Sequence, residues 1–270
     1  MGARSIIVTG AAGSLGRAVA LKFSKSSDHL VLTDADRESG MAVKDEILAR
    51  GGDATFIAAD LHEALDVHNV MAEALDSFGA VNVLAHCASH FEARPFLETT
   101  EDQFDTMMDR NVRAAFLLNK AVARQFIRQA ETPDDGGVDT ARSASIVNVV
   151  STEAMTANAD DAIFAASQGA VVQLTKAVAM TLSPYGARAN AVGISGVKEL
   201  LGETEVKTAE QRKASIEQIP LNRRGEPKEV ASAIHFLSTE GASFITGQVL
   251  VVDGGRLALS KSTVSEDESR

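Results

Sequence analysis

The sequence predicts an α/β fold, in which one doubly wound parallel sheet of about seven strands carries helices on both faces. Short apolar runs alternate with segments of helical period along all 270 residues, a pattern typical of parallel strands joined by right-handed helical crossovers. The first run is followed at once by a glycine-rich turn and then by an apolar-periodic helix. Neither a break in composition nor an internal repeat divides the chain, so one domain is expected over residues 1–257, followed by a polar tail at 258–270.

The expected strands are short apolar runs bounded by polar or glycine-containing turns. The first is Ser5-Ile6-Ile7-Val8, directly before the glycine-rich turn, and the last runs from Gln248 to Val252. In chain order the strands are expected at residues 5–8, 29–33, 54–58, 81–85, 145–150, 189–192 and 248–252.

The expected helices have apolar residues at helical spacing or carry recognisable end signals. Thr100-x-x-Gln103 is a capping box, Pro227 is typical of a first turn, and Gly79 ends a helix. The helix at 162–182 is apolar nearly all round and is expected to be buried, whereas the charged helix at 203–218 is expected to be the most mobile. After a first helix that ends near residue 24, helices are expected up to residue 50 and at 63–78, 101–129, 162–182, 203–218 and 227–237, with a solvated loop at 131–143.

Composition and charge argue against several classes of protein. A formal net charge of −11 disfavours a surface that binds nucleic acid or an anionic membrane. The first strand begins by residue 5, which leaves no room for a signal peptide, and no apolar run approaches the roughly 18–20 residues that span a bilayer. Cys87 is the one cysteine, so no internal disulfide can form and a reducing compartment, the cytoplasm, is expected.

A dinucleotide site is predicted by the turn Thr9-Gly10-Ala11-Ala12-Gly13-Ser14-Leu15-Gly16 and by Asp34. Glycines let the backbone approach a pyrophosphate, and the N–H groups at the start of the following helix favour an anion. Asp34 ends the second strand about 20 residues further on, where a carboxylate would meet the adenosine ribose hydroxyls; an ordinary loop aspartate is the alternative. The cofactor contacts expected within the turn are Gly10, Ala12, Gly13, Ser14, Leu15 and Gly16.

Between residues 5 and 255 the sequence resembles the short-chain dehydrogenase/reductase family at several motifs. Thr9-Gly10 with Gly16 looks like the family's cofactor turn, and Asp60-Leu61 looks like its adenine contact. The other matching positions are Asn111, Ile146-Val147-Asn148-x-x-Ser151, Arg188-x-Asn190-x-Val192, the run from Pro220 to Pro227, Thr246-Gly247 and Val252-Asp253-Gly254-Gly255. The resemblance implies a Rossmann-type sheet that binds NAD or NADP and moves a hydride to or from a carbonyl or an alcohol.

The most important departure from the family falls at its proton donor. Where the family has Tyr-x-x-x-Lys, thirteen residues after the serine, this sequence has Phe164 and Gln168, which share one face of a helix. In the family the tyrosine transfers the proton, while the lysine lowers its pKa and holds the nicotinamide ribose. A phenyl ring has no proton to give, whereas a glutamine amide can still hydrogen-bond a ribose hydroxyl. Tyr185 lies about five turns further along the helix and cannot substitute.

Two further motifs differ on the nicotinamide side of the expected cleft. The family's Asn-Asn-Ala-Gly is here His86-Cys87-Ala88-Ser89, and its Pro-Gly is Ile194-Ser195. Cys87 and Ala88 are still expected to line the cofactor, and His86 and His90 are expected as polar residues of the pocket wall. Although the two histidines flank a cysteine, no second ligand pair is evident, so no metal site is expected. The adenosine half of the site therefore looks intact and the nicotinamide half rebuilt.

Three polar residues remain as catalytic candidates. Ser151 and Asn111 keep the residue types of the family, although a serine at a strand end is more typical of a cap than of a nucleophile. Glu153 is the candidate replacement acid, because a partly buried glutamate can have its pKa raised into the working range; a solvated loop glutamate is the alternative. Asp160 and Asp161 are expected to cap the next helix.

Two functions remain open at this point. The chain is expected to be an NAD-dependent oxidoreductase with altered or impaired hydride transfer, or else a catalytically inactive nucleotide-binding or subunit-assembly protein. NAD is expected rather than NADP, because Asp34 would repel a 2′-phosphate and neither Gly13 nor Ala35 is basic. A homo-oligomer, a dimer or a tetramer, is expected because the helices at 101–129 and 162–182 resemble the family's main dimer interface. The sequence does not name a substrate.

Overall fold

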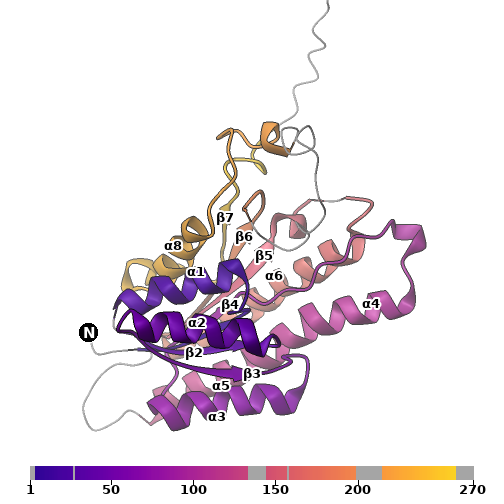
Figure 1. The fold of residues 1–270 in the computed structure, drawn as a ribbon. Helices are drawn as coiled ribbons and strands as arrows, with labels where there is room; N and C mark the ends of the chain where they lie inside the picture. The colour runs from indigo at the N-terminus through magenta and orange to yellow at the C-terminus, as the bar shows by residue number, and fades with distance from the viewer. Residues whose placement is uncertain (1–3, 27, 133–143, 157, 199–214, 260–270) are drawn as a thin grey trace, which may run out of the picture.

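Seven parallel strands form one sheet, in the order β3-β2-β1-β4-β5-β6-β7, which confirms the predicted fold class (Figure 1). The computed structural model describes residues 4–26, 28–132, 144–156, 158–198 and 215–259. Most of the expected helix at 203–218, most of the loop at 131–143 and the tail from 260 lie outside these residues. The strands are β1 (Ser5–Thr9), β2 (His29–Asp34), β3 (Asp53–Ala58), β4 (Val83–His86), β5 (Ser145–Ser151), β6 (Arg188–Ile194) and β7 (Val249–Val252).

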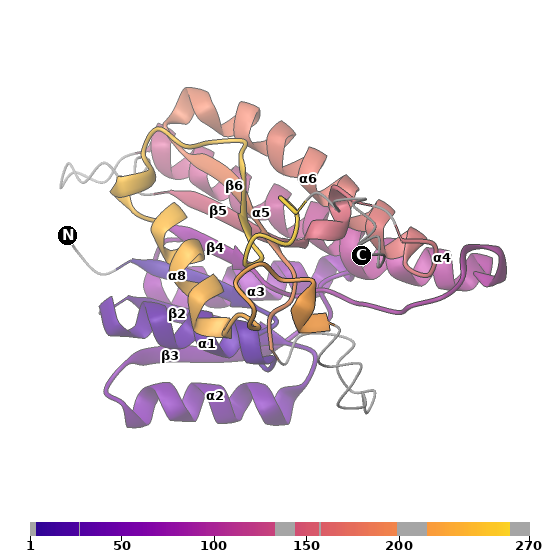
Figure 2. The ribbon, with the colours of Figure 1, turned by 90° about the horizontal axis from the view of Figure 1, so that it is seen from above.

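Helices cover both faces of the sheet, because successive side chains of a strand point to opposite faces. Ile6 and Val8 of β1 belong to a core shared with α1, α2 and α8, whereas Ile7 belongs to a core shared with α3, α5 and α6. Figures 1 and 2 show α1 beside α8, with α4 at the opposite side of the molecule. The helices are α1 (Ser14–Phe23), α2 (Arg37–Ala49), α3 (Ala64–Phe78), α4 (Glu101–Met107), α5 (Ala114–Glu131), α6 (Ala162–Leu182) and α8 (Pro227–Leu237).

The winding of the sheet changes direction between β1 and β4, which are neighbours although two strands separate them in sequence. In open parallel sheets, ligands bind in the crevice outside the carboxyl ends of the strands at such a point. The glycine-rich turn follows β1, and the altered His86–Ser89 segment ends β4. Both motifs that the sequence singled out therefore meet at the crevice.

The helix expected at 101–129 is interrupted in the structure. The capping box at Thr100 and Gln103 is present and starts α4, but Met108–Arg113 form a π-helical segment before α5 begins. Short π segments inside helices are frequent at functional sites, because the extra residue in the turn shifts the side chains around it. Asn111 lies in this segment and is buried.

Helix α6 is not buried all round, contrary to the expectation from its composition. Val171, Thr175 and Leu182 on its inner face are buried, but Met180 on its outer face is 62% exposed. By length and composition alone the helix Ala162–Tyr185 could also cross a membrane, which corrects the expectation that no apolar run is long enough. The core helix of a globular protein passes the same test, and here the inner face packs on β5 and β6.

Candidate active site

The glycine-rich turn after β1 has the tight geometry that a dinucleotide site needs. Gly10 has a φ of +64°, and a Cβ there would lie 2.8 Å from the Ala88 amide nitrogen. A Cβ on Gly16 would lie 2.0 Å from the Gly10 carbonyl oxygen. A Cβ on Gly13 would contact only the Gly10 carbonyl oxygen, at 3.4 Å. The fold itself therefore requires Gly10 and Gly16, whereas Gly13 leaves the start of α1 uncovered by a side chain.

Asp34 ends β2 and faces this turn. Its Oδ2 accepts a 3.0 Å hydrogen bond from the Ala12 N–H, and its Oδ1 accepts one of 3.0 Å from the Asp36 N–H. The carboxylate thus fixes the turn that it faces. Each ionised oxygen keeps a further lone pair, so the same group can accept a ribose hydroxyl.

Asp60 and Leu61 follow β3 and lie at the same edge of the sheet. Leu61 is buried in the core beside α3 and anchors the backbone there. The Asp60 carboxylate is exposed, and its Oδ1 lies 2.6 Å from His62 Nδ1. The residues expected to contact adenine therefore stand next to the end of β2, with the carboxylate accessible.

Hydrogen bonds to the Thr9 hydroxyl hold the end of β4 in place. Thr9 Oγ1 accepts the N–H groups of Cys87 and Ala88, both at 3.1 Å, so its single proton goes to His86 Nδ1 at 2.9 Å. His86 is 3% exposed, and burial lowers its pKa to about 4. Burial also raises the pKa of the Cys87 thiol to about 12. The expectation of a pocket-wall histidine is wrong: His86 is a neutral core residue, and Cys87 stays a thiol.

Asn111 ties the π-helical segment to the loop after β4 and to α6. Its Oδ1 accepts the His90 N–H at 2.7 Å, and its Nδ2 donates to the His90 carbonyl at 2.8 Å and to Ser167 Oγ at 3.0 Å. The Ser89 hydroxyl also donates to Oδ1 at 3.4 Å. Both ends of the amide are occupied, so Asn111 positions the loop and does not present a free donor to the crevice.

Ser151 ends β5 and is bonded on both sides. Its Oγ accepts the Glu153 N–H at 3.2 Å and thereby caps a short 3₁₀ turn, Thr152–Ala154. Its own N–H donates to Gln168 Oε1 at 3.0 Å. Gln168 is 3% exposed, with Nε2 turned to Ser167 at 3.4 Å. Where the family's lysine would hold the cofactor, a neutral amide joins β5 to α6, which argues against the ribose contact expected from Gln168.

Phe164, at the position of the missing tyrosine, packs against an aromatic ring that sequence analysis did not single out. The rings of Phe91 and Phe164 meet edge to face, with centroids 4.9 Å apart and planes at 87°. Phe164 is buried, and Phe91 directly follows His90, whose backbone Asn111 holds. The only sequence signal was an aromatic residue close behind the altered turn. An apolar pair stands where the family has its proton donor.

The Glu153 carboxyl is partly buried beside α6, the helix that carries Phe164, and its pKa is shifted. Burial raises its pKa, and the nearby Asp161 carboxylate raises it further. The charge of Arg256 and the hydrogen bond with Ser151 act in the opposite direction. Arg256 was missed in the sequence because it lies about 100 residues from Glu153 and follows a motif that otherwise matches the family.

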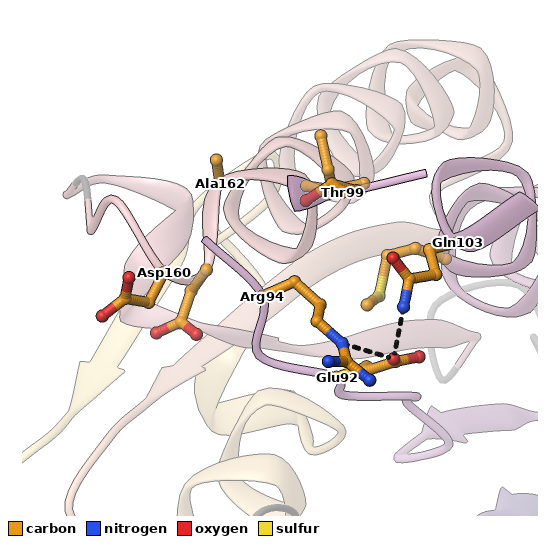
Figure 3. A pocket seen from close by; sticks show the side chains of 9 residues that line it. Glu92, Arg94, Thr99, Gln103, Asp160 and Ala162 are labelled. Atoms are coloured by element: carbon orange, nitrogen blue, oxygen red, sulfur yellow. Dashed lines mark hydrogen bonds and ion pairs between the residues drawn. The ribbon is translucent and has the colours of Figure 1, made fainter. Parts of the chain in front are cut away.

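A small hollow lies beside the start of α6 (Figure 3). Arg94 Nε and Gln103 Nε2 both donate to Glu92 Oε1, at 3.2 Å and 2.9 Å, and Figure 3 shows the three side chains converging. The hollow has room for about one water molecule, so it is too small for a substrate. Asp161 stands at the N-cap position, but its carboxylate accepts from Asn158 Nδ2 at 2.7 Å instead of from the helix. The expected side-chain cap is therefore wrong.

The first half of the crevice fits a nicotinamide dinucleotide better than the second half does. The N-cap residue of α1 is Gly13, which has no side chain, and the N–H groups and dipole of the helix start suit a pyrophosphate. Asp34 is placed for the adenosine ribose. On the nicotinamide side, the amide groups of Gln168 and Asn111 form hydrogen bonds within the protein. Within the described part of the chain, no group of three His, Cys, Asp or Glu side chains could hold a metal ion.

Comparisons with known sequences match almost the whole chain. Residues 10–256 match a family model described as enoyl-(acyl carrier protein) reductase. The chain is 28% identical over 256 residues to the L-rhamnose 1-dehydrogenase (NAD(P)(+)) of Azotobacter vinelandii, covering 93% of this chain and 96% of that protein. It is 29% identical over 253 residues to the 3-oxoacyl-[acyl-carrier-protein] reductase FabG of Staphylococcus epidermidis, covering 93% and 98%.

Solved structures agree with this match. A putative gluconate dehydrogenase from Agrobacterium tumefaciens superposes with a TM-score of 0.86 at 25% identity, covering 96% of this chain and 98% of that one. A dehydrogenase/reductase from Sinorhizobium meliloti superposes with a TM-score of 0.83 at 26% identity, covering 95% and 96%. The chain therefore belongs to the short-chain dehydrogenase/reductase family of oxidoreductases, whose members bind a nicotinamide cofactor.

Proposed function

We propose that this protein binds NAD(H) and is a divergent oxidoreductase that interconverts a carbonyl and an alcohol with Glu153, not a tyrosine, as its proton donor. The observation that carries the proposal is the position of Glu153. It follows Ser151 at the end of β5, and burial and the neighbouring Asp161 raise its pKa. A raised pKa keeps more of the carboxyl protonated near neutral pH than an ordinary glutamate would keep, as a general acid requires.

The chain's own residues divide the work in this proposal. Asp34 and the N–H groups at the start of α1 hold the adenosine and pyrophosphate end. Bound NADH would supply the hydride that reaches the carbonyl carbon of the substrate. Glu153 gives its proton to the carbonyl oxygen, so the product is the alcohol. Phe91 and Phe164 exclude water from one side of the reacting groups.

The cofactor preference follows from Asp34. Its carboxylate would accept from the 2′- and 3′-hydroxyls of NAD and repel the 2′-phosphate of NADP. Fluorescence titrations of NADH and NADPH test this preference, with NADH expected to bind more tightly. Asp34→Asn removes the repulsion and should narrow the difference between the two cofactors. Tighter binding of NADPH to the unaltered protein would contradict the assignment.

Turnover tests the proton donor. A general acid typically contributes about 10²–10⁴-fold, so Glu153→Gln should lower the rate of NADH-dependent carbonyl reduction by that factor while NADH binding is unchanged. Asp160→Asn is the matched control, because Asp160 is an exposed carboxylate between the turn that carries Glu153 and the start of α6. If Glu153→Gln keeps the rate of the unaltered protein, Glu153 is not the donor.

The alternative function is a nucleotide-binding or subunit-assembly protein without chemistry. This alternative is favoured by the amide groups of Gln168 and Asn111, because they hydrogen-bond within the protein and not toward a ligand. NADH binding without measurable turnover over a panel of aldehydes, ketones and oxo acids would decide for it. A rate above about 1 s⁻¹, the low end of typical turnover, would decide against it.

The proposal includes a symmetric homo-oligomer, a dimer or a tetramer. Phe116 on α5 and Met180 on α6 are exposed, and so are Phe244 and Leu250 near the β7 edge of the sheet. Large apolar side chains at two separate sites are typical of surfaces that a second subunit covers. Light scattering at micromolar concentration tests the assembly, and a monomer would contradict it. We also place the protein in the cytoplasm, since its one cysteine, Cys87, is a free, half-buried thiol.

A further inference from the structure

The loops after β5, β6 and β7 begin at one level of the sheet. The strand register pairs Ser151 with Ile194, and Ile194 with Val252. Ser195 is the next residue after Ile194, and a turn after Val252 leads to Arg256. Because the carboxyl ends of parallel strands share one edge, this register brings Arg256 to the crevice that holds Glu153.

The turn that presents Arg256 is built by a buried carboxylate. Asp253 accepts the N–H of Gly255 at 2.8 Å and that of Leu257 at 2.6 Å, and it is almost fully buried. Gly254 and Gly255 both have positive φ, of +66° and +90°, which suits glycine in so tight a turn. The backbone on either side of Arg256 is therefore fixed.

The Arg256 guanidinium is held by two neutral acceptors. Nη1 donates to Ser195 Oγ and Nη2 donates to Gln218 Oε1, each at 3.2 Å. Among the described residues, no carboxylate comes within ion-pair distance of it, although Glu153 lies near enough for the charge to act on its pKa. A guanidinium has five N–H donors, so three remain after these two bonds. The side chain is positioned by these two bonds and is exposed.

We propose that Arg256 binds the carboxylate of the substrate, so that the reaction assigned to Glu153 acts on a carboxylate-bearing oxo or hydroxy acid. This inference rests on the proposed function and adds the substrate class to it. The guanidinium fork matches a carboxylate in a bidentate geometry. With its carboxylate on Arg256, a short oxo acid places its carbonyl between that residue and Glu153.

The surrounding charges favour a carboxylate over a phosphoryl group. Glu153 and Asp161 both act on this part of the crevice, and Arg256 is the cation that acts on Glu153. A monoanion adds one negative charge beside these acids, whereas a phosphate dianion adds two and meets more repulsion. We therefore expect the protein to bind a carboxylate more tightly than a phosphonate.

Ligand-observed NMR titrations of 2-oxobutanoate, its neutral amide 2-oxobutanamide and methylphosphonate test the inference. The unaltered protein should bind the carboxylate at least about tenfold more tightly than the amide, which corresponds to about 1.4 kcal/mol. Arg256→Met should abolish this preference, and Arg256→Lys should keep part of it. Arg50→Met removes the exposed arginine that follows α2, at the amino end of β3 and so opposite the carboxyl ends of the strands, and should leave the preference unchanged.

Three outcomes would overturn the inference: no preference for the carboxylate in the unaltered protein, the same preference after Arg256→Met, or tighter binding of methylphosphonate. The comparison of carboxylate with amide stands even if a variant fails to fold. Each titration is run with and without NADH, and NADH binding is measured separately. Loss of NADH binding with a retained carboxylate preference contradicts the proposed function alone. NADH binding without that preference contradicts this inference alone.

Discussion

The two halves of the crevice differ in the hydrogen bonds that their polar groups form. Around β1 and β2, the N-cap residue of α1 is a glycine without a side chain, and Asp34 points a carboxylate at the turn. Around β4, β5 and α6, the polar side chains bond to one another: His86 to Thr9, and Gln168 to Ser151. The first half therefore has polar groups that can receive a ligand, whereas several polar groups of the second half bond within the protein. Under the proposed function, the proton transfer falls to Glu153 and the substrate contact to Arg256.

Gly16→Ala is expected to have the largest effect, and it probes the first half. The added Cβ would lie 2.0 Å from the Gly10 carbonyl oxygen, so the turn and α1 would have to separate. Overpacking costs about 1–3 kcal/mol and occasionally more, and a backbone contact this short belongs at the upper end. We expect the free energy of unfolding, measured by urea titration, to fall by about 3 kcal/mol and NADH binding to be lost.

Gly13→Ala is the matched control for this change. Its Cβ would meet only the Gly10 oxygen, at 3.4 Å, in a backbone conformation open to any residue. The free energy of unfolding should stay within about 1 kcal/mol of the unaltered protein. Equal losses in the two variants would mean that the turn does not have the shape described.

His86→Asn probes the second half through acid stability. Burial lowers the pKa of His86 to about 4 in the folded protein, whereas a histidine in the unfolded chain titrates near 6.5. The neutral ring therefore contributes stability that is fully present above about pH 6.5 and is lost as the pH falls through about 4. The loss amounts to about 3 kcal/mol at the acid end of that range.

The asparagine variant has no titrating ring, so this part of the acid dependence should disappear. Urea titrations from pH 7 to pH 4 measure it, and the comparison uses slopes with pH, so a constant packing cost cancels. His29→Asn is the control, because it removes a half-buried histidine at the start of β2 and leaves the His86 ring in place. An unchanged slope in His86→Asn would show that the ring titrates in the folded protein as it does in the unfolded chain, so that burial does not lower its pKa.

The fold and the cofactor turn could be predicted from sequence because their causes are local. Gly16 is imposed by a contact with Gly10 within one βα unit, and the Thr100 capping box is complete within four residues. The order of the strands follows from the alternation of strands and helices together with the right-handed crossover. Such features need no knowledge of distant contacts.

Most differences between the expected and the observed site concern contacts between distant segments, whereas the Asn158 to Asp161 bond in place of the expected cap is local. His86 reads as a polar loop residue until the hydroxyl of Thr9, 77 residues earlier, is seen to accept two backbone N–H groups beside it. The bond from the Ser151 N–H to the Gln168 amide, 17 residues further on, is likewise not indicated by the sequence pattern. No local sequence pattern indicates Arg256, because its position near Glu153 depends on the register of β5, β6 and β7. The π-helical segment around Asn111 likewise breaks a helix whose periodicity gave no warning.

Restoring the family's residues with Phe164→Tyr and Gln168→Lys is expected to have the smallest effect on activity. A lysine ammonium has no acceptor, so the Ser151 N–H loses the bond it now makes to Gln168. Leaving such a buried donor unpaired costs about 1–3 kcal/mol, which urea titration would measure. The new tyrosine would still face Phe91, and Ile194 and Ser195 would still replace the family's Pro-Gly.

The single variant Phe164→Tyr separates the two effects. It keeps the Gln168 to Ser151 bond and should unfold at nearly the urea concentration of the unaltered protein. Its hydroxyl would have no neighbouring ammonium to lower a pKa near 10, so it would be a poor acid at neutral pH. The double variant should therefore be the less stable of the two, and neither should gain NADH-dependent carbonyl reduction beyond the rate that Glu153 supports. If the double variant instead gains at least about tenfold in rate while keeping its stability, the second half of the crevice has kept the family's geometry, and its internal bonds rearrange when the cofactor binds.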